Sequence, residues 1–596
     1  MIILIKSTAE HGSRGFLLSI GTRNCVSIWI VIVLVGTFTP VGQAYEAPDY
    51  GSLLGHLDAE RAWSIVDELA GSTYAGRRSG TQGADLASEY IANYFSSIGL
   101  KPAGSGGTYR TKLTIPLWEL AQIPSIALVD ESDKVLQSFE YRKGFNVLPG
   151  SGEGEYSAEV IFGGYGITAK DLGYDDYAGI SARGKIVLVI VGTPPSDKLK
   201  EGNYGLSYAK ADNALNHGAV GLILVDSPAA PTAKYAQRAR CNCCWMIYRK
   251  LTILGGSIQF ADTLLKDSGL TLSTIQKTID RDIKPQSLAL GKRLHVSASV
   301  SFKERADTYN VLGLIPGSDP AASKKAVIVG AHYDHWGKDV DGNLFPGADD
   351  NASGVAVMME IGRLLSTWAK PKWSVLLAAW TGEEEGLYGS YDYVDRPYVP
   401  LVSTIAYLNL DMVGYGEELV GEVSEAHQAL RTVMIESAAE LDIPVHVEGY
   451  SGGSDSVPFE KKGVPNLMFI YWPDDVYEFY HTPADTASHV SKGDLLEASR
   501  LTALIALKLS KATVTAVSAT VSTTHLGTEM ETSAQPQPTT AVFRKELMVV
   551  LGAVLVVIVV AAAFHYGRSR KLNRTLSSSH YECSLHSSLD QGVGWP

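Results

Sequence analysis

The feature that most constrains the fold is an alternation of short apolar runs with helical patterns between residues 307 and 510. The apolar runs are residues 327–329, 375–378, 405–408 and 467–470, and helical patterns such as that of residues 355–368 separate them. Strands that alternate with helices form an open, mostly parallel sheet flanked by helices, so we predict this α/β architecture. In such a sheet, ligands bind where the strands end at their carboxyl edge.

Each of these apolar runs leads into histidine or carboxylate side chains. In chain order the runs are followed by His332, Asp334 and Asp350, by Glu383 and Glu384, by Asp411, and by Tyr480 and His481. Taken singly, a His-x-Asp or Glu-Glu pair is common on protein surfaces, and Asp-Asp-Asn before a helix is usually an N-cap. Five separate segments that converge on one edge have no simple structural explanation, because packed carboxylates repel each other unless a cation neutralises them.

The residue types indicate which cation this would be. Two imidazoles and three carboxylates without a thiolate are typical of catalytic zinc. A carboxylate that bridges two metals about 3.5–4 Å apart leaves a position for a shared water, whose pKa the metals lower. We therefore expect a site for two Zn²⁺ ions at the carboxyl edge of the sheet.

These residues, in their order and spacing, resemble the co-catalytic di-zinc aminopeptidase family that also contains aminopeptidase Y, glutamate carboxypeptidase and the transferrin receptor. The similarity extends from about residue 53 to residue 509 and includes the segment 75–83. It implies a zinc exopeptidase fold with an inserted protease-associated domain, two Zn²⁺ per chain and peptides as substrates. One departure is Ser456, where family members often have His or Tyr.

The resemblance also implies a role for each site residue. His332 and Asp411 match the terminal ligands of one zinc, Glu384 and His481 match those of the other, and Asp350 matches the bridge, with a cis peptide bond after it. Asp334 would hold the ring of His332, Glu383 would be the general base, and Tyr480 would donate a hydrogen bond to the oxyanion.

The expected activity is hydrolysis of the N-terminal peptide bond. A glutamate-carboxypeptidase-like or dipeptidase activity with the same metals stays open, because the residue that reads the free terminus is not identifiable. The alternative of another class is a receptor without catalytic activity, which the complete ligand set argues against. A single-zinc cyclase of similar fold is disfavoured because no ligand of the second metal is missing.

The rest of the chain is predicted to divide by composition. The expected segments are a signal peptide at 1–44, peptidase residues 45–149 and 301–511, a protease-associated-like insert at 150–300, a stalk rich in Thr, Ser and Pro at 512–545, a transmembrane helix at 546–566 and a cytoplasmic tail at 567–596. The insert contains a strand–helix–strand pattern without clustered His or carboxylates, so we expect it to be a lid or spacer. Cys241, Cys243 and Cys244 lie in it without a second pair at zinc-finger spacing.

The two apolar ends predict where the protein resides. A short apolar core at residues 26–35 precedes Ala44 and predicts a secretory signal, with an uncleaved signal anchor as the alternative. Residues 547–564 carry no charge and are followed by basic residues, which predicts a membrane span with a cytoplasmic tail. The catalytic part would then lie outside the cytoplasm, in an extracellular or periplasmic position. A formal net charge of −13 argues against nucleic acid as a partner.

Overall fold

The computed structural model describes residues 50–231, 234–236, 248–320, 325–471, 478–511 and 513–514. The predicted signal peptide, membrane span and cytoplasmic tail lie outside these residues, as do Cys241, Cys243 and Cys244 and all of the stalk except Thr513–Val514. Within the described ranges, no helix combines the length and the apolar character that crossing a membrane requires.

The predicted α/β sheet is present and has the order β1-β13-β18-β14-β19-β22-β20-β21, with β2 paired to β13. The strands are β1 (Lys101–Pro102), β2 (Arg110–Leu120), β13 (Val300–Ile315), β14 (Ala326–His332), β18 (Ser374–Trp380), β19 (Thr404–Leu410), β20 (Leu419–Val423), β21 (Val445–Glu448) and β22 (Asn466–Tyr471). The four central strands β18, β14, β19 and β22 are parallel, and the flanking pairs β13–β18 and β20–β22 are antiparallel. The carboxyl ends of these four parallel strands therefore lie at the same edge of the sheet.

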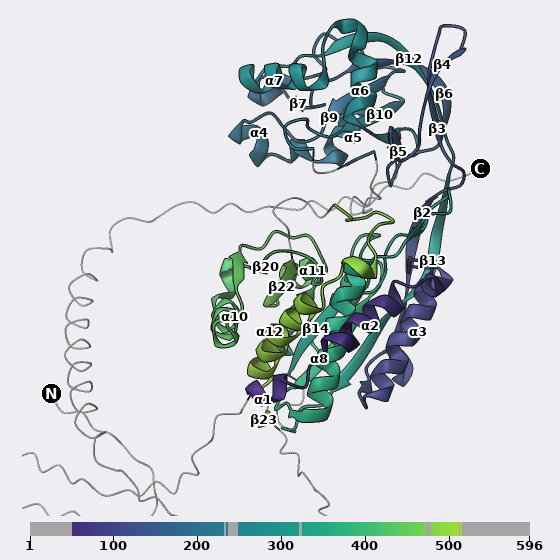
Figure 1. Ribbon diagram of the computed structural model, residues 1–596. Coiled ribbons are helices and arrows are strands. Elements are labelled where there is room, and N and C mark those ends of the chain that lie inside the picture. Colours follow the sequence, from purple (N-terminus) through teal and green to yellow (C-terminus); the bar gives the residue numbers. More distant parts are fainter. Residues whose placement is uncertain are drawn as a thin grey trace, which may run out of the picture. The chain divides into compact units, whose positions relative to one another are not determined.

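Helices cover both faces of this sheet because its central strands are apolar on both sides. Val327 and Val329 face a core shared with α2 (Ala59–Leu69), α3 (Gln82–Ser97), α8 (Gly354–Trp368) and α12 (Lys492–Ser510). Ala326 and Ile328 face a second core that includes residues of α9 (Tyr388–Asp395) and α11 (Ser456–Lys461). Side chains of a strand alternate between faces, so consecutive apolar residues fill two cores. Figure 1 shows α2, α3, α8 and α12 beside the sheet.

A second sheet is built from the residues between β2 and β13. Its order is β4-β3-β12-β6-β9-β10-β11-β5. The strands are β3 (Ser125–Val129), β4 (Val135–Phe139), β5 (Phe145–Val147), β6 (Gly154–Phe162), β9 (Ile186–Ile190), β10 (Gly221–Val225), β11 (Thr252–Gly256) and β12 (Leu288–Ala298), and the main helices are α5 (Ser207–Asn216), α6 (Ile258–Leu265) and α7 (Leu272–Asp282). The strand–helix–strand unit β9–α5–β10 is the one that the sequence pattern predicts, with β9 and β10 parallel.

The second sheet takes strands from Ser125 onwards, whereas the predicted insert begins at residue 150. The early strand β4 is largely exposed, so it lacks the continuous apolar run that marks β9 and β10. The second sheet therefore begins before the predicted start of the insert.

Candidate metal centre

The carboxyl edge of the first sheet brings together the residues that follow its parallel strands. His332 ends β14, Asp411 directly follows β19, and Glu383 and Glu384 lie in the turn after β18. Asp350 lies in the turn η6 (Ala348–Ser353), which leads into α8, and His481 follows β22. All the predicted ligands are buried.

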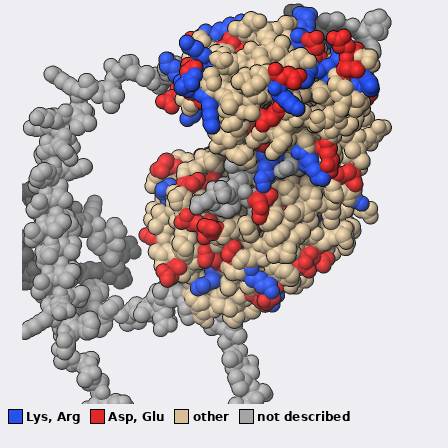
Figure 2. Space-filling view, turned by 45° about the horizontal axis from the view of Figure 1, so that its top comes forward, with Lys and Arg blue, Asp and Glu red and all other residues tan. Residues whose placement is uncertain are grey.

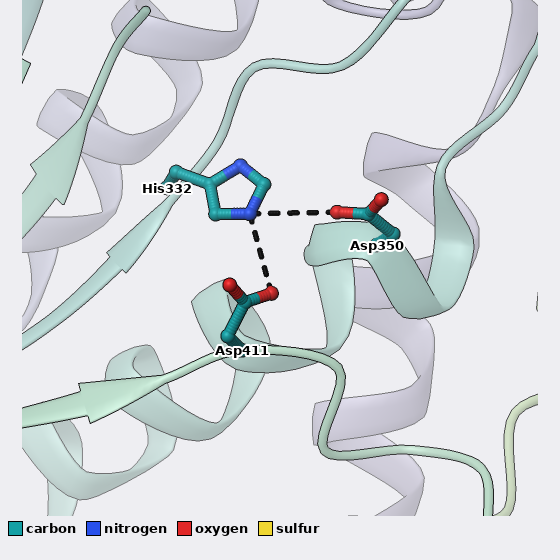
Figure 3. Close-up of side chains that lie close together, drawn as sticks. All are labelled: His332, Asp350 and Asp411. Carbon is teal, nitrogen blue, oxygen red and sulfur yellow. Dashed lines mark hydrogen bonds and ion pairs between the residues drawn. The ribbon is translucent and has the colours of Figure 1, made fainter. Parts of the chain in front are cut away.

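His332 meets two carboxylates at one ring nitrogen. Its Nε2 lies 3.3 Å from Asp411 Oδ1 and 3.4 Å from Asp350 Oδ1. Figure 3 shows both carboxylates directed at this nitrogen from different elements. Donor atoms bound to one tetrahedral zinc ion at about 2.0–2.1 Å lie roughly 3.3 Å apart, so this spacing fits a shared zinc.

A second group of donors lies on the other side of Asp350. His481 Nε2 is 3.0 Å from Asp350 Oδ2 and 3.2 Å from Glu384 Oε2. The two oxygens of Asp350 therefore face two different sets of nitrogen and oxygen donors. This is the arrangement expected of a carboxylate that bridges two cations.

The turn that carries Asp350 is fixed by its neighbours. The Asp350–Asn351 peptide bond is cis, as the family resemblance implies. The side chain of Asn351 donates to Leu410 O at 2.8 Å and accepts from Gly354 N at 2.9 Å. Asp485, to which sequence analysis assigned no role, accepts from the backbone N–H groups of Asp349 and Asp350 at 2.9 and 3.1 Å.

Asp334 has contacts that differ from the predicted ones. The nearest acceptor to His332 Nδ1 is the backbone carbonyl of Asp334, at 3.2 Å, whereas its carboxylate lies 3.9 Å away. The carboxylate instead accepts from the backbone N–H groups of Glu383 and Glu384, at 3.2 and 3.4 Å. Asp334 thus holds both the His332 loop and the glutamate turn.

Arg77 lies in the segment 75–83 and connects that segment to the loop that carries the site residues. Its guanidinium is fully buried and donates to four backbone carbonyls. The acceptors are Tyr333 O at 2.7 Å, Leu69 O at 2.6 Å, Pro346 O at 2.7 Å and Gly347 O at 2.6 Å. Tyr333 and Gly347 lie at the two ends of the loop that joins His332 to Asp350, so Arg77 fixes that loop.

Several buried carboxyl groups lie close together in this site, and their burial and proximity shift their pKa values. Burial, reinforced by neighbouring carboxylates, raises the pKa of Glu383 and of Glu384 well above the ordinary value. Burial also raises the pKa of Asp455 to about 7. For Asp350, burial opposes ionisation, but the histidines around it hold its pKa below the ordinary value. Divalent cations would remove the repulsion that raises the glutamate pKa values.

A cavity of about 590 Å³ opens onto these donors. Glu383 and Tyr480 line it, and the ring of Tyr480 stacks on that of His481 with centroids 3.7 Å apart. The wall also includes the apolar residues Met412, Val420, Met468 and Ile470 and the acidic residues Glu418, Glu422 and Glu448. The predicted base and the predicted hydrogen-bond donor thus share one cavity with His332, Asp350, Asp411 and His481.

The fold has close counterparts among solved structures. An aminopeptidase from Aneurinibacillus sp. strain AM-1 aligns with a TM-score of 0.57 and 21% identity over 78% of this chain and 97% of that one. The zinc aminopeptidase BSAP from Bacillus subtilis aligns with a TM-score of 0.53 and 20% identity over 76% and 95%. At these identities the likeness concerns the fold.

Sequence relatives cover shorter segments. Aminopeptidase YwaD of Bacillus subtilis (strain 168) is 34% identical over 189 residues, which are 29% of this chain and 39% of that protein. Aminopeptidase NAALADL1 of Mus musculus is 27% identical over 248 residues, or 35% and 31%. The matched segments thus span less than two fifths of either relative.

The fold is that of solved aminopeptidases, and the donor set has the residue types of a catalytic zinc site. Residues 310–506, which include all five predicted ligands, match the model of Peptidase family M28. The similarity to this family therefore concerns that segment of the chain.

Proposed function

We propose that this protein is a two-zinc exopeptidase that removes residues from the amino terminus of peptides. The observation that carries the proposal is the pair of donor groups around Asp350, with nitrogen–oxygen separations of 3.0–3.4 Å. His332 and Asp411 would hold one ion, Glu384 and His481 the other, and Asp350 both. Zinc at this site supplies polarisation of the scissile carbonyl and a lowered pKa of the attacking water.

The protein's own residues would handle the protons. Glu383 would take a proton from the attacking water and return it to the leaving amine, which requires it to change protonation state during turnover. Its position on the cavity wall and its raised pKa support this role. Tyr480 would donate its hydroxyl proton in a hydrogen bond to the tetrahedral oxyanion.

The lining of the cavity favours a substrate with a free ammonium group. Glu418, Glu422 and Glu448 line its wall beyond the metal ligands, and none of the described lining residues is Lys or Arg. A carboxylate would be repelled there, while the protonated amino terminus of a peptide would be attracted.

A carboxypeptidase or dipeptidase that reads a C-terminal glutamate would need cationic partners for carboxylates. Near the site, Arg78 and Arg142 line a different cavity of about 220 Å³. Arg78 Nε already donates to Glu385 at 2.9 Å, and Arg142 Nε donates to Asp339 at 2.7 Å. This second activity is therefore the weaker candidate.

A receptor without catalytic activity would not need a complete set of metal donors together with a general base such as Glu383.

Nucleic acid is not proposed as a partner either, because Figure 2 shows acidic and basic side chains interspersed on the face it presents, without a continuous basic stripe.

We also propose the predicted placement of the protein. A secretory signal at 1–44 and a span at 546–566 would tether the peptidase outside the cytoplasm, with a short tail inside. The second sheet would be a protease-associated module without chemistry of its own. Protease accessibility of the peptidase on intact cells would test the placement.

The activity is tested with a panel of reporters. Aminoacyl reporters with a free amino group, the same compounds with a blocked amino group, and peptides that end in glutamate are incubated with the zinc-loaded wild type and with Glu383→Gln. We expect hydrolysis of the free aminoacyl reporters by the wild type alone. Hydrolysis restricted to N-blocked substrates or to C-terminal glutamate would refute the aminopeptidase proposal.

A further inference from the structure

His335 is a buried histidine beside the metal ligands to which sequence analysis assigned no role. It lies in the loop after β14 and is 0% exposed. Its Nδ1 is 2.8 Å from Glu384 Oε1 and 3.7 Å from Asp350 Oδ2. Its Nε2 has no hydrogen-bond partner among the residues that the structure describes.

His335, Asp350 and Glu384 lie close enough together to hold an ion, but the contact between His335 and Glu384 has the length of a hydrogen bond. At 2.8 Å it is well below the roughly 3.3 Å expected between donors on a tetrahedral zinc, and it matches an N–H···O bond. As a zinc ligand, Glu384 would be ionised and could only accept, so Nδ1 of His335 would carry the proton and donate it to Glu384. The other oxygen of Glu384, Oε2, lies 3.2 Å from His481 Nε2. The two oxygens of Glu384 therefore have different partners.

The position of the imidazole is closely determined by its surroundings. A Cβ atom at Gly347 would lie 2.4 Å from Cγ of His335, so the absence of a side chain at Gly347 makes room for the ring. The backbone N–H of His335 donates to Arg77 O at 3.4 Å. The ring packs edge-on to His481, with centroids 5.8 Å apart. A ring that only filled space would be better apolar, because a buried Nε2 without a partner costs free energy.

We propose that His335 is a positioning residue for the second zinc ligand set. By holding Oε1 of Glu384, its Nδ1–H turns Oε2 towards His481, where the two would share an ion. The inference rests on the proposed function, because it takes Glu384 and His481 to bind zinc. Loss of hydrogen bonds of this kind to metal ligands typically lowers metal affinity by about 10–100-fold.

The test compares three substitutions that differ in where they place a donor. In His335→Asn the amide nitrogen lies close to the place of Nδ1, in His335→Gln it lies about one bond further out, and His335→Ala has none. The matched control is His427→Ala, which removes another histidine bonded to a glutamate, with Nε2 2.9 Å from Glu460 Oε2 and outside the metal centre. Zinc binding is measured by competition with a chromophoric chelator, and circular dichroism and thermal melting establish that each variant is folded.

We expect two zinc ions per chain in the wild type and an affinity for one of them that falls about 10–100-fold in His335→Ala and His335→Gln. His335→Asn should recover that affinity to within about threefold, and His427→Ala should match the wild type. Unchanged affinity in His335→Ala would overturn the inference. An equal loss in folded His335→Asn and His335→Ala would also overturn it, because it would make His335 a direct ligand. A wild type that binds no zinc would instead refute the proposed function, so the two failures are distinguishable.

Discussion

The described part of the chain contains two sheets with parallel strands, and they differ in the side chains placed just after those strands. In the first sheet the strand ends lead to His332, Glu383 and Asp411, which line one cavity. In the second sheet β10 is followed by Asp226, which accepts from Tyr235 N at 3.0 Å, and β11 by Ser257, which caps α6 through Phe260 N at 3.1 Å. In the part of the chain that the structure describes, the side-chain groups spaced closely enough to hold a metal ion both lie at the first sheet. They are His332, Asp350 and Asp411, and His335, Asp350 and Glu384.

The difference between the two sheets shows that a parallel sheet provides a position for a site but not the side chains that form it. Strand ends of both sheets carry polar residues, but those of the second sheet satisfy local backbone groups. Those of the first sheet have partners on other strands. Function therefore follows from the residue types at the edge and not from the architecture.

Glu383→Gln should have the largest effect, and it tests whether the residues at the edge of the first sheet carry the chemistry. Removing the proton acceptor while keeping the shape should lower kcat by about 10³-fold and leave the zinc content unchanged. Steady-state kinetics with a free aminoacyl reporter and metal analysis would measure this. Glu385→Gln is the neighbouring control, because Glu385 pairs with Arg78, and its kcat should stay within roughly tenfold. Near wild-type turnover of Glu383→Gln would mean that the base lies elsewhere.

Arg77→Met tests whether the first sheet depends on its loop support. Four buried carbonyls lose their donor, so we expect the free energy of unfolding to fall by about 3–5 kcal/mol and zinc binding to weaken with it. Denaturant unfolding and metal titration would measure the two effects. Full zinc affinity in this variant would show that the loop between His332 and Asp350 holds its shape without Arg77.

Lys210→Met is the matching change in the second sheet. Lys210 is also fully buried, and its Nζ donates to Gly192 O at 2.7 Å and to Tyr165 O at 2.5 Å. Fewer carbonyls lose a donor, so a loss of about 2 kcal/mol is expected. Zinc content and kcat should not change, because the metal centre belongs to the other sheet. A loss of zinc here would contradict the separation of the two regions.

The smallest expected effect is on the pH dependence of stability after chelation. Burial raises the pKa of Asp334 to about 6 and that of Asp455 to about 7. A raised carboxyl pKa stabilises the folded state below the unfolded pKa of about 4, and this stabilisation is lost as pH rises through the folded pKa. The Tm in EDTA should therefore be several degrees lower at pH 7.5 than at pH 5. Calorimetry at both values would measure it, and a higher Tm at pH 7.5 would contradict the assignment.

The ligand prediction rests on polar residues that come after apolar strands, and the parallel centre of the first sheet was predictable from the alternation of strands and helices. The supporting residues were not. Arg77 donates to Tyr333, 256 residues away, and its partners are backbone carbonyls, which leave no mark on the sequence. His335 lies three residues after His332 and was visible in the motif, but its contact with Glu384 depends on a side-chain direction that spacing does not specify.

The most direct test of the account is the zinc stoichiometry of the wild type and of Asp350→Ala, purified without chelator and dialysed against buffered zinc. Because both oxygens of Asp350 face donor groups, we predict two zinc ions per chain in the wild type and none in the folded variant. A wild type without zinc, or an Asp350→Ala variant that keeps both ions, would contradict the account.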